Sequence, residues 1–149
     1  MPSSADFQEF LNHFSNNALQ SLHHAEGIAR SLGSAYVGTE HLLLGLLAQE
    51  SSTGAKLLSG AGITLDGATV ALNTVPKTLV VNTGGAKGLS ETAKLTLRMA
   101  YDASQDYNQE FCGTEHILLS ILSQKNARAT LLLRDMNINI DTLMAEIEQ

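Results

Sequence analysis

Apolar residues recur every three or four positions along much of the chain, which is the spacing of an amphipathic helix with one buried face. The first such stretch follows Ser15, whose hydroxyl can accept a hydrogen bond from a free N–H of the first helical turn. It ends before Gly33, a residue type that commonly stops a helix. The apolar stripe consists of Ala18, Leu22, Ala25, Ala29 and Leu32. The pattern therefore predicts a helix between Ser15 and Gly33.

A denser apolar run, Leu42 to Ala48, follows the tetrapeptide Gly-Thr-Glu-His at residues 38–41. Thr39 is the expected N-cap, which puts Glu40 in the first helical position, where the helix dipole favours a negative charge. The third helical position is then Leu42, so no capping box is expected. Because this helix is apolar on most sides, it is predicted to lie at the centre of its half.

Two further helices are predicted before residue 74. A short one covers roughly Thr53 to Ser59 and stops at the sequence Gly60-Ala61-Gly62. The next one is capped by Thr64 and extends through Leu65 to Leu72, since the hydroxyl of Thr64 can take up an N–H of the first turn. The first half of the chain is thus expected to contain four helices.

The same pattern returns in the second half at an offset of 75 residues, which places Thr39 on Thr114. No gap is needed from about residue 14 to residue 73, and an ungapped match of this length indicates an internal duplication. In the second half, Ser90 and Asn139 take the capping positions, Tyr107 takes the slot of Leu32, and helices are expected after Ser90, after Thr114, at about 127–134 and at 140–147.

The duplication defines the expected organisation of the chain. Repeat one covers about residues 14–73, a linker with Pro76 and a Gly-Gly pair covers about 74–88, and repeat two covers about 89–148. Ahead of repeat one, residues 5–13 could add a turn or two of helix with Phe7, Phe10 and Leu11 on its apolar face. The predicted fold class is all-α: two duplicated four-helix units related by a pseudo-two-fold axis within one domain.

The composition fits a chain that buries a core and narrows the classes of partner. Hydrophobic residues make up 44% and charged residues 16% of 149 residues, and the net charge is −6. The scattered Lys and Arg residues argue against nucleic acid and against a membrane surface as partners. One cysteine and the absence of a signal-peptide pattern favour a cytoplasmic protein. The isolated domain is expected to be a monomer.

Residues with catalytic or metal-binding potential are few. The sequence Gly-Gly-Ala-Lys-Gly at residues 84–88 lacks the spacing of a phosphate-binding loop. His23 and His24 are adjacent and point about 100° apart on a helix, so they are expected on the surface or in packing. Cys112 is expected to be a buried, inert thiol, because its equivalent in repeat one is Val37.

The Glu-His pair in each repeat is the remaining candidate for a metal centre. If the repeats faced each other, Glu40-His41 and Glu115-His116 could form a symmetric cluster, and a small metal-dependent enzyme is one hypothesis. The expectation is nevertheless no metal and no cofactor, with each His packed into its half and donating a ring N–H to a backbone carbonyl. Adjacent Glu and His side chains project in different directions at the start of a helix.

With the repeat established, the chain resembles the Clp N-terminal repeat family. The residues that carry this resemblance are the two Gly-Thr-Glu-His motifs with their leucine runs. They also include the helix openings at residues 14–18 and 89–93, and the Gly-Ile-Thr-Leu-Asp step at residues 62–66. The resemblance covers nearly the whole chain. It implies an eight-helix, pseudo-two-fold bundle that forms the N-terminal domain of AAA+ unfoldases of the ClpA, ClpB and ClpC kind.

The resemblance also implies a function that is binding rather than catalysis. Such domains recruit substrate and adaptor proteins to the ATPase ring and its peptidase. In ClpC-type members they read phosphoarginine with the glutamate of the motif and a hydroxyl residue of the first helix. Carried over, these residues are Glu40 with Ser15 and Glu115 with Ser90. A carboxylate suits a guanidinium, and helix N-termini suit a phosphate.

Two parent proteins are compatible with this resemblance. The chain could be the N-terminal domain of a ClpC-type AAA+ ATPase, with the ATPase modules following in the native protein. Alternatively, it could be a free-standing accessory or decoy protein of the Clp machinery without its own ATPase. Continuation of the native chain into a nucleotide-binding motif would separate the two.

Overall fold

The computed structural model describes residues 9–34, 36–74 and 88–148 of the chain. Within these ranges it contains eight helices and, apart from two isolated bridges, no β-structure. A helical turn at residues 9–11 comes first. The helices of repeat one are α2 (Asn16–Ser31), α3 (Thr39–Ala48), α4 (Thr53–Gly60) and α5 (Leu65–Thr74), and those of repeat two are α6 (Glu91–Asp106), α7 (Thr114–Ser123), α8 (Arg128–Asp135) and α9 (Ile140–Glu148).

The predicted helices and most of their caps are confirmed. Ser15 Oγ accepts from the N–H of Ala18 at 3.2 Å, and Ser90 Oγ accepts from the equivalent Ala93 at 3.0 Å. Thr64 and Asn139 cap the fourth helix of each repeat in the same way. Gly33 follows α2 with a φ of +72°, a left-handed conformation that glycine adopts without strain. The predicted linker at 74–88 lies largely outside the described residues.

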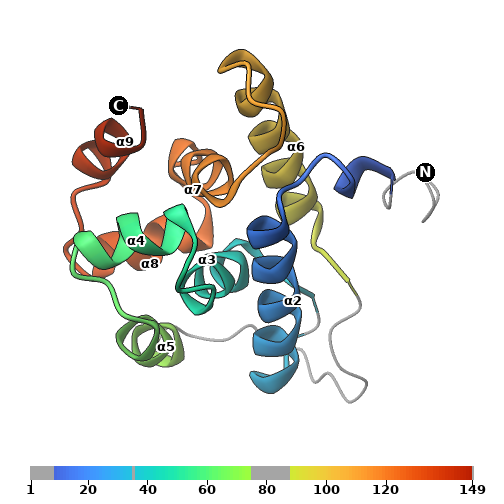
Figure 1. Cartoon of the computed structure of the whole chain (residues 1–149). Coiled ribbons are helices and arrows are strands. Elements are labelled where there is room, and N and C mark those ends of the chain that lie inside the picture. Colours follow the sequence, from blue (N-terminus) through green and yellow to red (C-terminus); the bar gives the residue numbers. More distant parts are fainter. Residues whose placement is uncertain (1–8, 35, 75–87, 149) are drawn as a thin grey trace.

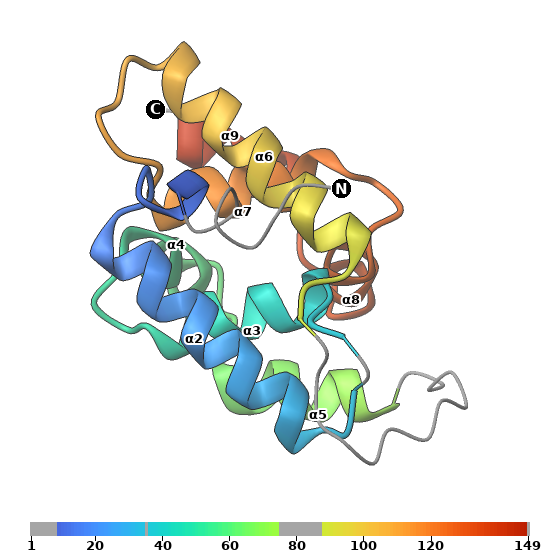
Figure 2. The same cartoon turned by 90° about the vertical axis from the view of Figure 1, so that its right-hand side faces the viewer.

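The helices form layers around two central ones. In Figure 1, α2 and α6 lie on the right, α3 and α7 in the middle, and the third and fourth helices of both repeats on the left. Figure 2 views the molecule from that right-hand side and shows α2 and α6 in front. The largest fully buried side chains of the central pair are Leu43, Leu44, Leu46, Ile117, Leu118, Ile121 and Leu122. The predicted central position of this helix in each repeat is confirmed.

The two repeats interlock instead of packing as separate halves. Helix α8 packs on α3 of the other repeat, and α4 packs on α7. Two isolated parallel β-bridges also link the repeats: one joins Phe14 to Cys112, and the other joins Val37 to Leu89. The helix packing and the bridge each occur in two equivalent copies, so the structure has the expected pseudo-two-fold arrangement. Both repeats contribute side chains to one shared core.

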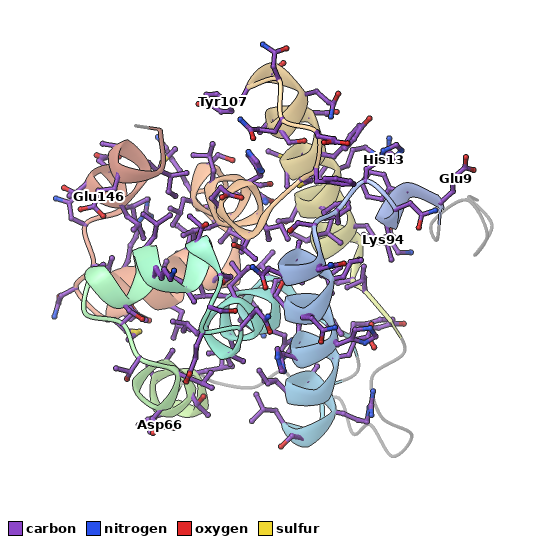
Figure 3. All side chains as sticks on the ribbon, viewed as in Figure 1. Glu9, His13, Asp66, Lys94, Tyr107 and Glu146 are labelled. Atoms are coloured by element: carbon purple, nitrogen blue, oxygen red, sulfur yellow. The ribbon has the colours of Figure 1, made fainter. Side chains whose placement is uncertain are left out.

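The segment ahead of α2 packs onto this bundle. Phe10 meets Phe14 edge to face, with ring centroids 5.2 Å apart, and Tyr101 of α6 at 5.6 Å. The predicted apolar roles of Phe10 and Leu11 are confirmed, since both pack against the core, whereas Phe7 lies outside the described residues. Figure 3 shows charged side chains such as Asp66 and Lys94 on the outside. None of the described helices has the length and apolar character to cross a membrane.

Candidate functional site

The glycine of each Gly-Thr-Glu-His motif makes room for the glutamate two residues later. Gly38 and Gly113 are the N-caps of α3 and α7, so each helix begins one residue earlier than predicted. A Cβ on Gly38 would overlap with Oε1 of Glu40, and a Cβ on Gly113 would overlap with Oε1 of Glu115. The glutamate side chain thus folds back over its own N-cap in both copies. Both carboxylates lie in the first helical turn, as predicted, where the dipole favours them.

The histidine of each motif accepts a hydrogen bond at the helix start. The N–H of Gly38 donates to Nδ1 of His41 at 2.9 Å, and that of Gly113 donates to Nδ1 of His116 at 2.8 Å. This corrects the predictions of a ring donating to a carbonyl and of no capping box. With Gly as N-cap, the third helical position is His, which does what Glu or Gln does in a capping box.

This contact fixes the protonation state of both rings. A nitrogen that accepts a hydrogen bond carries no proton, so each ring is neutral with its proton on Nε2. In repeat one, Nε2 of His41 lies 3.1 Å from the hydroxyl of Ser34. Burial lowers the pKa of His41 and of His116 below the ordinary histidine value, because it disfavours the charged ring.

The threonine of each motif caps a helix of the other repeat. Oγ1 of Thr114 accepts from the N–H of Gly54 in α4 at 2.8 Å, and Oγ1 of Thr39 accepts from the N–H of Ala129 in α8 at 3.2 Å. The prediction that these threonines cap their own helices was therefore wrong. Each hydroxyl satisfies a buried first-turn N–H across the interface, which ties the two repeats together.

The predicted site residues come together across the repeats. The N–H of Ser90 donates to the carbonyl of Val37, just ahead of α3, and the N–H of Ser15 donates to the carbonyl of Cys112, just ahead of α7, both at 2.9 Å. Ser90 thus lies beside the start of the Glu40 helix, and Ser15 lies beside the start of the Glu115 helix. Each candidate site is built from two repeats.

The predicted pairs within one repeat, Ser15 with Glu40 and Ser90 with Glu115, are not formed. Helices α2 and α3 run antiparallel: Gln49, after the end of α3, donates to Asn17 at the start of α2 at 2.9 Å. Ser15 and Glu40 therefore stand at opposite ends of α2, roughly 24 Å apart for sixteen residues of helix. Residue order alone does not reveal this crossing.

The two sites differ in what their carboxylates contact. Oε2 of Glu40 lies 3.4 Å from Nη1 of Arg128, the first residue of α8, and the Glu40 side chain is 5% exposed. Among the described residues, Glu115 has no lysine or arginine within ion-pair distance, and its side chain is 32% exposed. Arg128 was not predicted as a site residue, although the two repeats differ visibly at this position: its equivalent at the 75-residue offset is Thr53.

One aromatic side chain contacts the histidine next to Glu115. The ring of Tyr107 stacks on His116 with centroids 6.5 Å apart. Tyr107 was predicted in a slot of the buried stripe, but it is 47% exposed. Its equivalent Leu32, which is likewise the first residue after its helix, packs against the core. Figure 3 shows it at the end of α6. Phe111, two residues ahead of Gly113, is also exposed, as is its equivalent Tyr36.

Cys112 is buried, as predicted, and burial is the main cause that raises the pKa of its thiol to about 12. The nearby charge of Glu115 raises this pKa further. Since the thiolate is the reactive form, burial and this raised pKa both disfavour Cys112 as a nucleophile.

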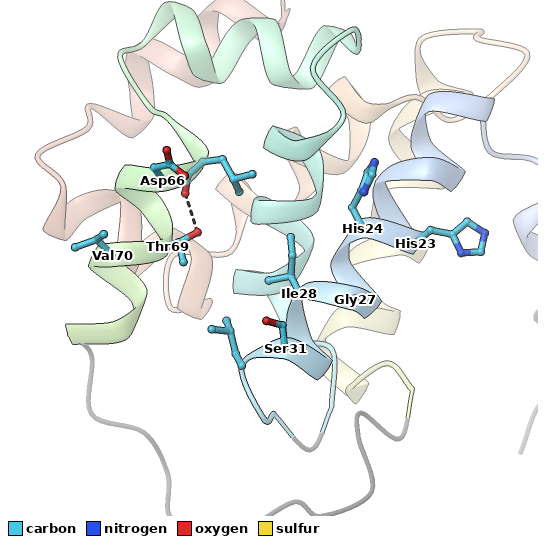
Figure 4. Close-up of a pocket in the computed structure, with 10 residues that line it drawn as sticks. His23, His24, Gly27, Ile28, Ser31, Asp66, Thr69 and Val70 are labelled. Carbon is cyan, nitrogen blue, oxygen red and sulfur yellow. Dashed lines mark hydrogen bonds between the residues drawn. The ribbon is translucent and has the colours of Figure 1, made fainter.

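Other polar groups do not assemble into a metal centre in the described part of the chain. No three His, Cys, Asp or Glu side chains within residues 9–34, 36–74 and 88–148 are grouped to hold an ion. His24 contacts Gln49 at 3.1 Å, and both His23 and His24 line an open pocket of about 660 Å³ between α2 and α5. In Figure 4, Ile28 and Ser31 face the side chains of α5 across this pocket.

Comparison with known proteins agrees with the internal duplication. The profile of the Clp repeat (R) N-terminal domain matches residues 13–92 and again residues 88–149. The chain belongs to this family. The two matches correspond to the two repeats, so each copy of the Gly-Thr-Glu-His motif lies in a Clp repeat.

Relatives of this Clp repeat domain include ATP-binding subunits of Clp proteases. The ClpA homolog of Trieres chinensis is 33% identical over 87% of this chain, and ClpC of Staphylococcus aureus is 30% identical over 87%. The chain spans only about 15–16% of the length of these relatives. The solved N-terminal domain of ClpD from Arabidopsis thaliana has a TM-score of 0.78 at 25% identity and covers 93% of this chain and 94% of its own.

Proposed function

We propose that this chain recruits substrate and adaptor proteins to a ClpC-type ATP-dependent unfoldase, and that it recognises phosphoarginine at the site formed by Glu115 and Ser15. One observation carries the proposal beyond the family: Glu115 is a half-exposed carboxylate at a helix start that has no cation of its own among the described residues. The role is one of binding, and the ATPase ring and its peptidase supply the chemistry in the cytoplasm.

The chemistry of the site suits both parts of phosphoarginine. A carboxylate pairs with a guanidinium through charge-assisted hydrogen bonds. A phosphate is favoured at a helix N-terminus, where free N–H groups and the helix dipole both attract an anion. The Glu115 site adjoins the N-terminus of α2, because Ser15 is both the N-cap of α2 and the partner of Cys112.

A protein of the same fold has been solved with a bound peptide. The ClpV N-domain has been solved in complex with a VipB peptide, and it aligns with this chain at a TM-score of 0.73 and 19% identity. This likeness concerns the fold alone, so the choice of ligand rests on the residues of this chain.

Calorimetric titration with phosphoarginine tests the proposal, with arginine and phosphate as separate ligands. Wild-type protein should bind phosphoarginine and should bind neither component alone with comparable affinity. Glu115→Gln should weaken binding by about tenfold or more, because a hydrogen bond between charged groups contributes at least one such factor. Glu146→Gln on α9 is the matched control, because it removes the same charge at an exposed position on α9 (Figure 3). Unchanged affinity in Glu115→Gln would refute the proposed site.

A further inference from the structure

The two candidate sites share the Gly-Thr-Glu-His motif, but in the described part of the chain only the Glu40 carboxylate is paired with an arginine. We propose, on the basis of the function proposed above, that Arg128 is an internal guanidinium that closes the Glu40 site, so that the domain takes phosphoarginine at the Glu115 site alone. Arg128 then acts as a resident competitor for any external guanidinium at Glu40.

The position of Arg128 follows from the cross-repeat caps. Arg128 is the first residue of α8, and the next residue, Ala129, donates its N–H to Thr39 of the neighbouring motif. The equivalent first residue of α4 is Thr53, and the next residue, Gly54, donates to Thr114. Both third helices therefore present their first side chain at the motif of the other repeat. Only one of them presents a guanidinium.

The Glu40 carboxylate is engaged through one of its oxygens. Oε2 accepts from Nη1 of Arg128 at 3.4 Å, a contact that Glu115 does not have with any described lysine or arginine. The Glu40 side chain is only 5% exposed, whereas that of Arg128 is 58% exposed. A ligand would first have to displace Arg128, which is held next to the carboxylate by the start of its own helix and therefore competes at high effective concentration.

The Glu115 site has the opposite properties. Its carboxylate folds over Gly113 as Glu40 folds over Gly38, so the two carboxylates are presented in the same way. Thr53 stands where Arg128 stands in the other site, and its side chain is too short and carries no charge. The structure thus contains one carboxylate that already holds a guanidinium and an equivalent one that is ready to hold one.

The helix N-termini that would face the phosphate also differ between the two sites, and this difference again favours the Glu115 site. Helix α2, beside Glu115, has no acidic residue in its first turn. Helix α6, beside Glu40, has Glu91 there, 3.7 Å from Lys94. A carboxylate in the first turn disfavours a phosphate at that helix N-terminus for two reasons. The two negative charges repel each other, and the carboxylate already offsets the positive end of the helix dipole. The Glu115 site is therefore the more favourable one for both the guanidinium and the phosphate of phosphoarginine.

Exchanging the two residues tests this proposal directly. Arg128→Thr gives the Glu40 site the residue found at the open site, and Thr53→Arg gives the Glu115 site the residue found at the closed one. Both positions are helix starts with exposed side chains, so both variants should fold. Calorimetry with phosphoarginine should give one equivalent bound for wild type, a second and weaker equivalent for Arg128→Thr, two equivalents for Arg128→Thr/Glu91→Gln, and a loss of affinity of about tenfold or more for Thr53→Arg.

The possible outcomes distinguish closure of the Glu40 site by Arg128 from the proposed binding of phosphoarginine. One equivalent in both Arg128→Thr and Arg128→Thr/Glu91→Gln, with Glu115 still required, would overturn the closure by Arg128 and leave the proposed function standing. Two equivalents in wild type would overturn the closure as well. A loss of binding in Arg128→Thr would assign Arg128 to ligand binding and overturn the proposal. No binding in any variant, with unfolding transitions intact, would overturn the proposed function and this inference together.

Discussion

Replacing Thr114 by Val removes a hydrogen bond that joins the two repeats and leaves their shapes almost unchanged. Oγ1 of Thr114 accepts from the N–H of Gly54 at 2.8 Å, and both residues are buried. Gly54 has no room for a side chain here, because a Cβ would approach the Thr114 side chain to 3.0 Å. Val keeps the branched outline of Thr but offers no acceptor.

The expected cost follows from leaving a buried N–H without a partner. Such a group costs about 1–3 kcal/mol, and an isosteric replacement adds little from lost packing. For a chain of this size, each kcal/mol corresponds to about 2–4 °C in Tm. Thr39→Val should lie at the lower end of the same range, because its bond to Ala129 is longer, at 3.2 Å.

Urea and thermal unfolding of Thr114→Val measure this cost, with Thr92→Val as the control. Thr92 is exposed on α6, so its replacement should change the free energy of unfolding by no more than about 0.5 kcal/mol. The m-value should stay constant if only stability changes. A Thr114→Val protein as stable as Thr92→Val would refute the idea that the motif threonine holds the repeats together.

Three more predictions concern the other residues of the motif and the cysteine beside it. Gly113→Ala should lower the free energy of unfolding by no more than about 1 kcal/mol, because the added Cβ would overlap only with the carboxylate end of the Glu115 side chain, which can rotate away; denaturant unfolding should show a smaller loss still in a Glu115→Ala background, and a loss of several kcal/mol in Gly113→Ala would contradict a carboxylate that can move. Burial lowers the pKa of His41 and His116, so below about pH 6.5 the unfolded chain binds protons that the folded chain excludes, and stability falls as the pH drops. A His41→Gln/His116→Gln protein should be about as stable as wild type at pH 7.5, since Gln can accept the same N–H, and should lose less stability by pH 5; equal losses would assign the pH dependence to other groups. With a pKa of about 12, Cys112 should resist a thiol reagent at pH 8 in the folded chain and react fully in urea, whereas rapid reaction of the native protein would refute its burial.

The helices could be predicted because their signals are local. The three- and four-residue spacing marks the buried face of each helix, and the capping roles of Ser15, Ser90, Thr64 and Asn139 depend only on residues three positions away. The duplication doubled this information, since the same signals appear in both repeats.

The partners of the motif residues could not be predicted in the same way. Periodicity shows that a face is buried but not against which segment, and in a duplicated chain every contact can form within one repeat or between the two. Thr39 and Thr114 look like caps of their own helices, yet their hydroxyls lie on the other repeat. The same ambiguity led to pairing Ser15 with Glu40.

Two other features left a signal that pattern reasoning did not use. His at the third helical position accepts from the N-cap N–H, but the usual capping-box pattern names only Glu and Gln there. Arg128 stands against Thr53 at the duplication offset, and this break in symmetry was visible in the printed sequence. Residues that differ between otherwise equivalent repeats are therefore the ones to examine first for function.

The most direct test of the account is to map phosphoarginine onto the wild-type chain by NMR, following backbone amide shifts during a titration. We expect saturable shifts at Ser15, Asn16, Gly113 and Glu115, with the equivalent amides at Ser90, Glu91, Gly38 and Glu40 unmoved. Equal shifts at both sets of amides would contradict the closure of the Glu40 site by Arg128. Shifts confined to other surfaces, such as the pocket between α2 and α5, would contradict binding of phosphoarginine at the site formed by Glu115 and Ser15.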